Sequence, residues 1–238
     1  MERFPLLHMN GDYGMGNRRG LFVVFEGIDG SGKSTQIGRL SDYVRAQDKY
    51  QDVLLTREPT WRATELKDKL KGDSDAFSDA RLMARLFVED RKIHAYSQIL
   101  PVLKERCFVI CDRYTMSTLA YQSAQGEDMR ALIQLHIDAK ITARDLTFYV
   151  NVSNATAAKR RIARGESAEK FEKDASFMQK LHETYDGIIQ SLGYNDELTA
   201  LLGDVRVING EQEKEKVFEE IRIRFDEVYS TWKDSRNL

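Results

Sequence analysis

Residues 21–35 read Leu-Phe-Val-Val-Phe-Glu-Gly-Ile-Asp-Gly-Ser-Gly-Lys-Ser-Thr. The part from Gly27 to Ser34 matches the pattern G-x-x-x-x-G-K-[ST] and follows a short apolar run, which is typical of a buried strand. The glycines let the backbone wrap with its N–H groups pointing inward around a phosphate. A helix that begins near Lys33 would direct its positive end to the same point. The stretch therefore predicts a phosphate-binding loop for ATP or GTP.

Each position of this loop has an expected role. The Lys33 ammonium should reach the β and γ phosphates, and the Ser34 hydroxyl is an expected ligand of Mg²⁺. The residues expected to bind the nucleotide are Gly27, Ile28, Asp29, Gly30, Ser31, Gly32, Lys33, Ser34 and Thr35.

Further apolar runs follow at regular intervals along the chain. Continuous rather than alternating runs are typical of strands buried on both faces of a parallel sheet. Segments with helical periodicity separate them, and residues 217–232 carry one apolar stripe. The pattern predicts an α/β fold, a doubly wound five-stranded parallel sheet flanked by helices. The expected strands lie at residues 21–25, 53–55, 108–111, 146–152 and 205–208.

Composition limits the class of protein. The 238 residues carry a formal net charge of −2, which argues against nucleic acid as the main partner, because duplex binding demands a basic face. No stretch of 18 apolar residues is present, so we expect no membrane span. Cys107 and Cys111 lie in one apolar run and are expected to be reduced core residues, which suits a cytoplasmic protein.

Two arginines follow the second and third apolar runs. Arg57 lies in Thr-Arg-Glu-Pro at residues 56–59, and Arg113 lies in Asp112-Arg-Tyr. In a doubly wound sheet, ligands bind at the carboxyl ends of the strands, so both side chains should lie beside the phosphate loop. Arginine grips a phosphate through two parallel hydrogen bonds. The pair predicts a second phosphate-bearing substrate, and Asp112 at the same edge is an expected partner of Mg²⁺.

Several motifs together resemble the thymidylate kinase family. They occur in order between Leu21 and about Ile208 and so cover most of the chain. The matching segments are the loop at 25–35, Thr-Arg-Glu-Pro at 56–59, Leu-Phe-Val-Glu-Asp-Arg at 86–91, Asp-Arg-Tyr at 112–114, Ser-Thr-Leu-Ala-Tyr-Gln at 117–122, and a basic segment at 159–172 that is similar to the mobile lid of the family.

The resemblance implies phosphorylation of dTMP to dTDP by Mg-ATP, in dTTP synthesis for DNA. It implies that Arg57 and Arg113 hold the dTMP phosphate and that Phe87 stacks on thymine, as an aromatic face does on a base. Arg91 would reach a thymine carbonyl. The other residues implied at the acceptor site are Asp29, Glu58, Pro59, Ser117, Thr118, Tyr121 and Gln122.

Two of these residues carry more specific expectations. Tyr121 would pack against the sugar and disfavour a 2′-hydroxyl. Asp29 would accept a hydrogen bond from the 3′-hydroxyl or help to place Mg²⁺.

The sequence also divides the chain, because residues 1–19 hold several glycines and a proline, and no repeat, low-complexity tract or linker splits the part that follows. We expect a flexible N-terminal extension at residues 1–20 and a single P-loop kinase domain at 21–238, with its lid at about 159–172. Some members carry an arginine inside the phosphate loop, where this chain has Gly30, and others supply the catalytic cation from a basic lid. Positive charge is needed on the phosphoryl oxygens as the bond loosens. The expected catalytic residues are Lys33, Asp29, Arg113, Arg164 and, as second choice in the lid, Arg160.

Other interpretations remain open at this point. A deoxynucleoside kinase would share the fold and use Glu58 as a base, and a nucleotide-binding regulatory protein would keep the loop without transferring phosphate. The chain also departs from the family pattern, with Thr60-Trp-Arg after Pro59 and Arg144 where Pro is usual. Trp61 beside Arg57 could reshape the mouth of the acceptor site. Apolar residues around more than one face of a helix expected at 79–104 indicate burial on two sides, either under another helix or against a second subunit. The resemblance to thymidylate kinases implies a homodimer through this region.

Overall fold

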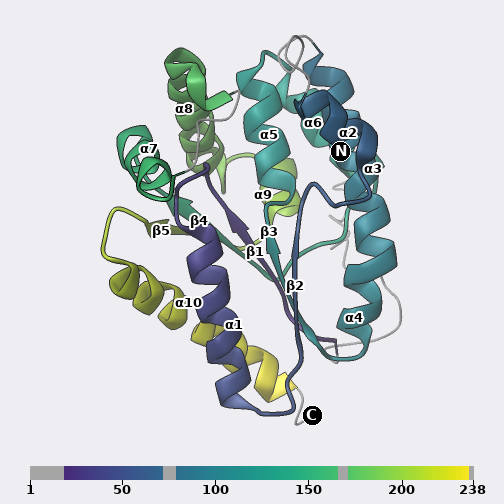
Figure 1. Cartoon of the computed structure of the whole chain (residues 1–238). Coiled ribbons are helices and arrows are strands. Elements are labelled where there is room, and N and C mark those ends of the chain that lie inside the picture. Colours follow the sequence, from purple (N-terminus) through teal and green to yellow (C-terminus); the bar gives the residue numbers. More distant parts are fainter. Residues whose placement is uncertain (1–18, 72–78, 166–170, 236–238) are drawn as a thin grey trace.

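The computed structural model describes residues 19–71, 79–165 and 171–235 (Figure 1). Residues 1–18 of the expected N-terminal extension and residues 166–170 of the expected lid lie outside the described residues. The division of the chain into an extension and one domain therefore stays a prediction.

Five parallel strands form one sheet in the order β2-β3-β1-β4-β5. This confirms the predicted sheet, and each strand lies within two residues of its predicted run. The strand β1 occupies the centre, so the carboxyl end of β1 is flanked by those of β3 and β4. The strands are β1 (Phe22–Glu26), β2 (Val53–Arg57), β3 (Phe108–Asp112), β4 (Leu146–Asn151) and β5 (Val205–Asn209).

Helices cover both faces of this sheet (Figure 1). The helix predicted at 79–104 is confirmed, and it contains one π-helical turn. The helices are α1 (Lys33–Gln47), α2 (Thr64–Lys71), α3 (Ala80–His94), the π turn η1 (Ala95–Ile99), α4 (Leu100–Lys104), α5 (Thr115–Ala124), α6 (Met129–Asp138), α7 (Asn154–Ala163), the 3₁₀ turn η2 (Phe171–Lys173), α8 (Ala175–Ser191), α9 (Asp196–Leu202) and α10 (Lys214–Ser235).

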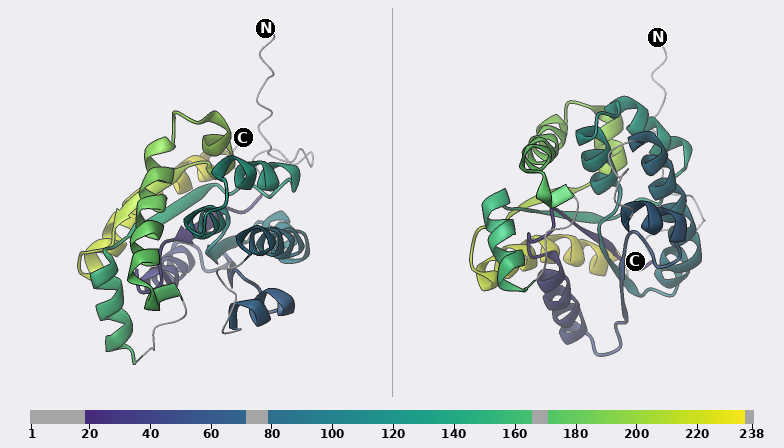
Figure 2. Two further views of the ribbon diagram at one scale, coloured as in Figure 1. Left: turned by 90° about the horizontal axis from the view of Figure 1, so that it is seen from above. Right: turned by 45° about the horizontal axis from the view of Figure 1, so that its top comes forward.

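The central strand shows why the apolar runs are continuous. Val23 and Phe25 pack into a core beneath α1 and α10, whereas Phe22 and Val24 pack into a second core with residues of α3 and α4. Figures 1 and 2 show α1 and α10 together on one side of the sheet. Burial on both faces is confirmed for β1, β3 and β4 but is only partial for β2 and β5, because these two strands form the edges of the sheet.

Both cysteines are free. Cys111 is buried in β3, but Cys107 precedes that strand and is only half-buried, so the expectation of two core residues is right for Cys111 alone. Among the described residues, no helix combines the length and the apolar character needed to cross a membrane.

Candidate active site

The phosphate loop connects β1 to α1 and is shaped by glycines that pack against backbone. Gly27 has φ +138°, and a Cβ added there would lie 2.7 Å from the Val150 carbonyl oxygen. Gly30 has φ +91°, and a Cβ would lie 2.4 Å from the Ala157 carbonyl oxygen of α7. L side chains rarely adopt this φ range, so both positions require glycine. Contact with α7 thus explains why this loop has no arginine at position 30.

Lys33 begins α1 and is folded back over its own loop. Its Nζ donates to the carbonyl oxygens of Gly27, at 2.8 Å, and Ile28, at 3.1 Å. The side chain is only 5 % exposed, and burial, followed by the charge of Arg113, lowers the pKa of Lys33. Its ammonium also lies 3.9 Å from Asp112 Oδ1.

Asp112 ends β3 beside this lysine and supplies a group suited to a metal ion. Its Oδ1 is buried and has no hydrogen-bond partner within the described ranges. The exposed Ser34 lines the same pocket as Asp112. Mg²⁺ is commonly held by one or two protein oxygens together with substrate phosphates and water. A carboxylate oxygen without a hydrogen-bond partner among the described residues and a hydroxyl that lines the same pocket therefore fit a magnesium ion that is shared with a bound nucleotide.

Arg113 follows β3 in a constrained backbone conformation, with φ +70°. Its N–H donates to the Phe25 carbonyl oxygen at 2.8 Å. Its guanidinium donates to Asp29 Oδ1 at 2.7 Å and to Ser117 Oγ at 3.1 Å, with a longer contact of 3.4 Å to the Tyr121 hydroxyl. The third strand thus delivers its arginine to the phosphate loop, as predicted, where Asp29 already pairs with it.

The charges around Asp29 account for its ionisation. Burial acts to raise the pKa of this carboxyl, but Arg113 and then Lys33 outweigh it and hold the pKa well below the usual value. The carboxylate is 48 % exposed and therefore faces both the arginine and solvent.

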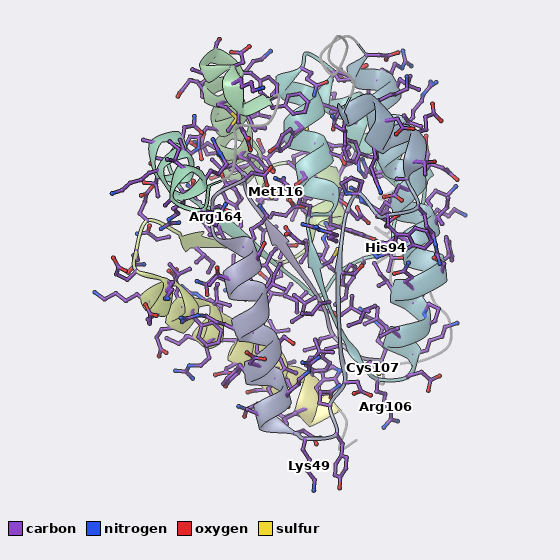
Figure 3. All side chains as sticks on the ribbon, in the orientation of Figure 1. Lys49, His94, Arg106, Cys107, Met116 and Arg164 are labelled. Carbon is purple, nitrogen blue, oxygen red and sulfur yellow. The ribbon has the colours of Figure 1, made fainter. Side chains whose placement is uncertain are left out.

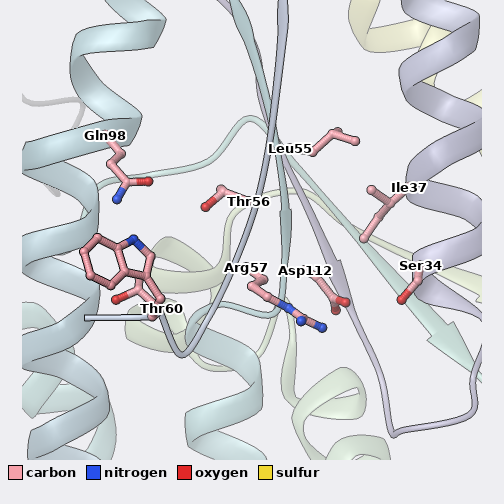
Figure 4. Close-up of a pocket in the computed structure, with 9 residues that line it drawn as sticks. Ser34, Ile37, Leu55, Thr56, Arg57, Thr60, Gln98 and Asp112 are labelled. Atoms are coloured by element: carbon pink, nitrogen blue, oxygen red, sulfur yellow. The ribbon is translucent and has the colours of Figure 1, made fainter. Parts of the chain in front are cut away.

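Arg57 ends β2 in a different environment. Its side chain is exposed and has no protein partner within the described ranges. It lines a pocket of about 470 Å³ together with Ser34 and Asp112. Figure 4 shows the guanidinium extending toward these two side chains. Residues from β2, α1, η1 and the loop after Pro59 complete the pocket, and they include Thr60, Trp61 and Gln98.

A network of buried polar side chains lies behind the two arginines. The Arg91 guanidinium, 1 % exposed, donates from Nε to Glu58 Oε2 at 2.8 Å and from Nη2 to Thr118 Oγ1 at 3.0 Å. His94 Nδ1 contacts the other Glu58 oxygen at 3.0 Å. Arg91 Nη1 lies 2.8 Å from Nε2 of His136, whose pKa is lowered to about 3 by burial and then by Arg91.

This network changes what is expected of two predicted acceptor residues. Both carboxylate oxygens of Glu58 are engaged by interior partners, so its side chain lies behind the acceptor site rather than in it. The Arg91 guanidinium also donates to the Tyr114 carbonyl oxygen. Four of its five N–H groups already have protein partners, which leaves one N–H of Arg91 for contact with thymine.

The remaining predicted acceptor residues lie on α3, α5 and the loop after β2. Gln122 is buried, and its Oε1 has no hydrogen-bond partner among the described residues. Burial raises the pKa of Tyr121 to about 12, so its hydroxyl stays protonated and can donate a hydrogen bond. Phe87 and Pro59 are both half-buried. The assignment of these side chains to thymine and deoxyribose stays a prediction.

Two lid arginines contact the phosphate loop. Arg160 Nη1 donates to the Ser31 carbonyl oxygen at 3.1 Å, and Arg161 Nη1 donates to that of Asp29 at 2.6 Å. Arg164, the first choice from sequence, is the exposed residue that ends α7 (Figure 3). Proximity to the loop in this structure therefore favours Arg160 over Arg164.

Sequence reasoning did not select some residues that the structure brings to the site. Glu26 is fully buried and accepts hydrogen bonds from the backbone of Tyr114 and from the Ser117 hydroxyl, at 2.9 and 2.5 Å. Burial raises the pKa of Glu26 despite the opposing bonds from Ser117. Its place directly before Gly27 was a usable signal. No spacing signal pointed to Arg161 or His136.

The sequence of the chain is similar to those of known proteins. Residues 25–195 match the model of a family described as thymidylate kinase. A protein of Pyrococcus abyssi named "Probable thymidylate kinase" is 35 % identical over 210 residues, which cover 85 % of this chain and 94 % of that protein. A "Thymidylate kinase" of Ruegeria pomeroyi is 42 % identical over 157 residues, covering 64 % of this chain and 73 % of that protein. The range matched by the family model includes the loop, acceptor and lid segments.

Proposed function

The chain belongs to the thymidylate kinase family, and from this premise we propose that it transfers the γ-phosphoryl of Mg-ATP to dTMP. A member of this family is a nucleoside monophosphate kinase, a phosphotransferase that acts on small nucleotides. The product, dTDP, serves dTTP synthesis for DNA. The resemblance inferred from the motifs is thereby confirmed at the level of the family.

One observation carries the choice of a monophosphate acceptor. Arg57 ends β2 and Arg113 follows the adjacent strand β3, on the edge of the sheet where Lys33 and the phosphate loop lie. Arg57 lacks a protein partner within the described ranges, and Arg113 is paired with a half-exposed carboxylate. Two such cations beside an ATP loop suit a second anionic phosphate.

The residues of the phosphate loop and its neighbours have separate roles in phosphoryl transfer. The backbone of residues 27–35 would wrap the ATP phosphates, and Lys33 would leave its loop carbonyls to reach the β and γ oxygens. Ser34 and Asp112 would hold Mg²⁺, which neutralises developing charge on the phosphates. Arg113 and a lid arginine, Arg160 before Arg164, would add positive charge on the transferred group.

The geometry disfavours the alternative of a deoxynucleoside kinase. That reaction needs a base to deprotonate the sugar 5′-hydroxyl, and Glu58 was the candidate. Glu58 is 5 % exposed and bonded through both oxygens to Arg91 and His94. A monophosphate acceptor needs no such base, because its phosphate oxygen is already ionised near neutral pH.

The proposal also covers the acceptor pocket and the oligomeric state of the protein. Phe87, Thr118, Tyr121 and Gln122 would contact thymine and deoxyribose. We propose a homodimer through α3 and the adjoining π turn, since Ile93 and Tyr96 are exposed there. The free cysteines support a cytoplasmic setting. Light scattering on the full chain and on Ile93→Glu tests the dimer, which should dissociate in the variant.

Product analysis tests the proposed function directly. The protein is incubated with Mg-ATP and either dTMP or thymidine, and the nucleotides are resolved by chromatography. We expect dTDP from dTMP and no dTMP from thymidine. Turnover of thymidine alone would support the deoxynucleoside kinase, whereas tight ATP binding without ADP release for any monophosphate would support a regulatory protein.

A panel of monophosphates then measures specificity. Comparison of dTMP with dUMP shows how strictly the 5-methyl group is required. Comparison of dTMP with its 2′-hydroxylated analogue tests the role assigned to Tyr121.

A further inference from the structure

A closed ring of contacts joins the lid to the acceptor side of the site. Its members come from the phosphate loop, α5, α7 and η2, segments far apart in the sequence. In order around the ring they are Asp29, Arg113, Tyr121, Phe171, Glu172 and Arg161. The Arg113 guanidinium lies 5.3 Å from the centre of the Tyr121 ring, and the Phe171 ring lies 5.8 Å from that ring at a steep angle.

Arg161 closes this ring through two contacts. Its Nη1 donates to the Asp29 carbonyl oxygen at 2.6 Å, and its Nε lies 3.8 Å from Glu172 Oε2. The Arg161 and Glu172 side chains are 8 % and 5 % exposed, so both groups are largely removed from water. Water screens a buried pair of charges less than an exposed pair, so this contact can hold η2 against α7.

Asp29 is consequently held at both ends. Its carbonyl oxygen accepts from Arg161, while its carboxylate accepts from Arg113, the arginine proposed to grip the acceptor phosphate. A shift of the residue 29 backbone would carry the carboxylate with it and turn the guanidinium of Arg113. Outer partners that orient a binding group commonly change affinity or activity 10- to 100-fold when removed.

The neighbouring arginine has different partners. Arg160 donates to the carbonyl oxygens of Ser31 and Gly210, and among the described residues no hydrogen bond joins either of these to the side chain of Arg113 or Tyr121. The two adjacent lid arginines therefore contact different parts of the site. Arg160 contacts the turn of the ATP loop at Ser31, and Arg161 contacts Asp29 on the acceptor side.

We propose that Arg161, paired with Glu172, is a positioning residue that orients Arg113 toward the acceptor phosphate by holding Asp29 in place. The inference rests on the proposed function, because it assigns Arg113 to the monophosphate. It makes a lid residue a determinant of acceptor affinity, whereas a lid arginine that only stabilises the transferring phosphoryl group would act on kcat.

The experiment separates these two roles by steady-state kinetics with Mg-ATP and dTMP varied independently. For Arg161→Met, we expect KM for dTMP to rise about tenfold, with kcat and KM for ATP changed by less than about threefold. Arg161→Lys should recover part of the loss, since it can still donate to the Asp29 carbonyl oxygen. Glu172→Gln should change KM for dTMP in the same direction by a smaller factor.

Lys159→Met is the matched control, because it removes an exposed positive charge from the same helix; its kinetics should equal those of the wild type. Circular dichroism and thermal melting establish that each variant is folded. A fall in kcat for Arg161→Met with KM for dTMP unchanged would overturn the proposal, and so would equal effects of Arg161→Met and Lys159→Met.

A wild-type protein that phosphorylates a different monophosphate would overturn only the choice of dTMP. The same variants would then be compared on the monophosphate that is accepted, with the same expected split between KM and kcat. Absence of turnover with every monophosphate in the wild type would overturn both the proposed function and this inference.

Discussion

The ends of β2 and β3 each carry an arginine, and the two arginines are treated differently by the fold. Arg57 extends from an edge strand into an open pocket and has no partner among the described residues. Arg113 follows an inner strand, adopts φ +70°, and bonds to Asp29 and Ser117. The same side chain at equivalent strand ends is thus free in one case and preorganised in the other.

The difference follows from the neighbours of each strand. β3 lies between β1 and β2, so residues after it meet the phosphate loop that follows β1. β2 has a neighbour on one side only, so the residue at its end faces solvent on the other. A preorganised side chain loses little conformational freedom when the substrate binds. A side chain without partners can also add affinity, but it must first be ordered. We therefore expect Arg113 to act on both acceptor binding and turnover, and Arg57 on acceptor binding alone.

Replacement of Arg113 should have the largest effect. Arg113→Gln removes the charge beside the transferring group and leaves Asp29 without its partner. We expect kcat/KM for dTMP to fall about 10²–10³-fold, through a higher KM for dTMP as the grip on the acceptor is lost and a lower kcat as a preorganised donor is lost. Steady-state kinetics measure this, and thermal melting should also show a loss of stability. An unchanged kcat would refute the assigned difference between the strand ends.

Replacement of Arg57 should have a smaller and distinct effect. Arg57→Ala removes charged hydrogen bonds to the acceptor in both ground and transition states, so KM for dTMP should rise about 10- to 100-fold with kcat little changed. The melting temperature should equal that of the wild type, because no contact within the described protein is lost. Wild-type affinity for dTMP in this variant would exclude Arg57 from the acceptor site.

The pair between Arg113 and Asp29 can be tested by its dependence on pH. Because the folded-state pKa of Asp29 lies below its unfolded value of about 3.9, its pairing stabilises the fold at higher pH, and this stabilisation is lost as pH falls below about 4. The stability difference between wild type and Asp29→Asn should be constant from pH 5 to 8. We expect about 1 kcal/mol, because the carboxylate is half-exposed.

Chemical denaturation at each pH measures this difference. It should shrink between pH 4 and 3 if the protein remains folded there. A difference that grows as the pH falls would contradict the assigned ion pair.

Replacement of Trp61, which lies close to the end of β2, should have the smallest effect on KM for dTMP. Its indole is 71 % exposed, lines the Arg57 pocket and lies 5.1 Å from the Arg62 guanidinium. Exposed contacts of this kind contribute about 0.5–1 kcal/mol. Trp61→Ala should therefore change KM for dTMP by about fivefold or less. A larger change would mean that Trp61, rather than Arg57 alone, shapes the acceptor mouth.

Much of the fold and part of the site could be predicted from local patterns. The spacing of Gly27, Lys33 and Ser34 predicted a loop between a strand and a helix, and β1 and α1 flank this loop. The positions of Arg57 and Arg113 after apolar runs predicted that both would lie at one edge of the sheet. What the patterns did not predict is the direction of the neighbouring side chains: Glu58 turns inward to Arg91 and His94.

The strands, the phosphate loop and the family were readable from the order of residues, because periodicity, glycine placement and motif spacing are local properties of a chain. The partner of each charged group was decided by tertiary structure. Arg161 meets Asp29 across 132 positions of sequence, and Arg113 meets Asp29 across 84. Such pairs form only when sheet order and helix packing bring distant segments together. They explain why Arg113 is bonded to protein groups, whereas Arg57 has no partner among the described residues.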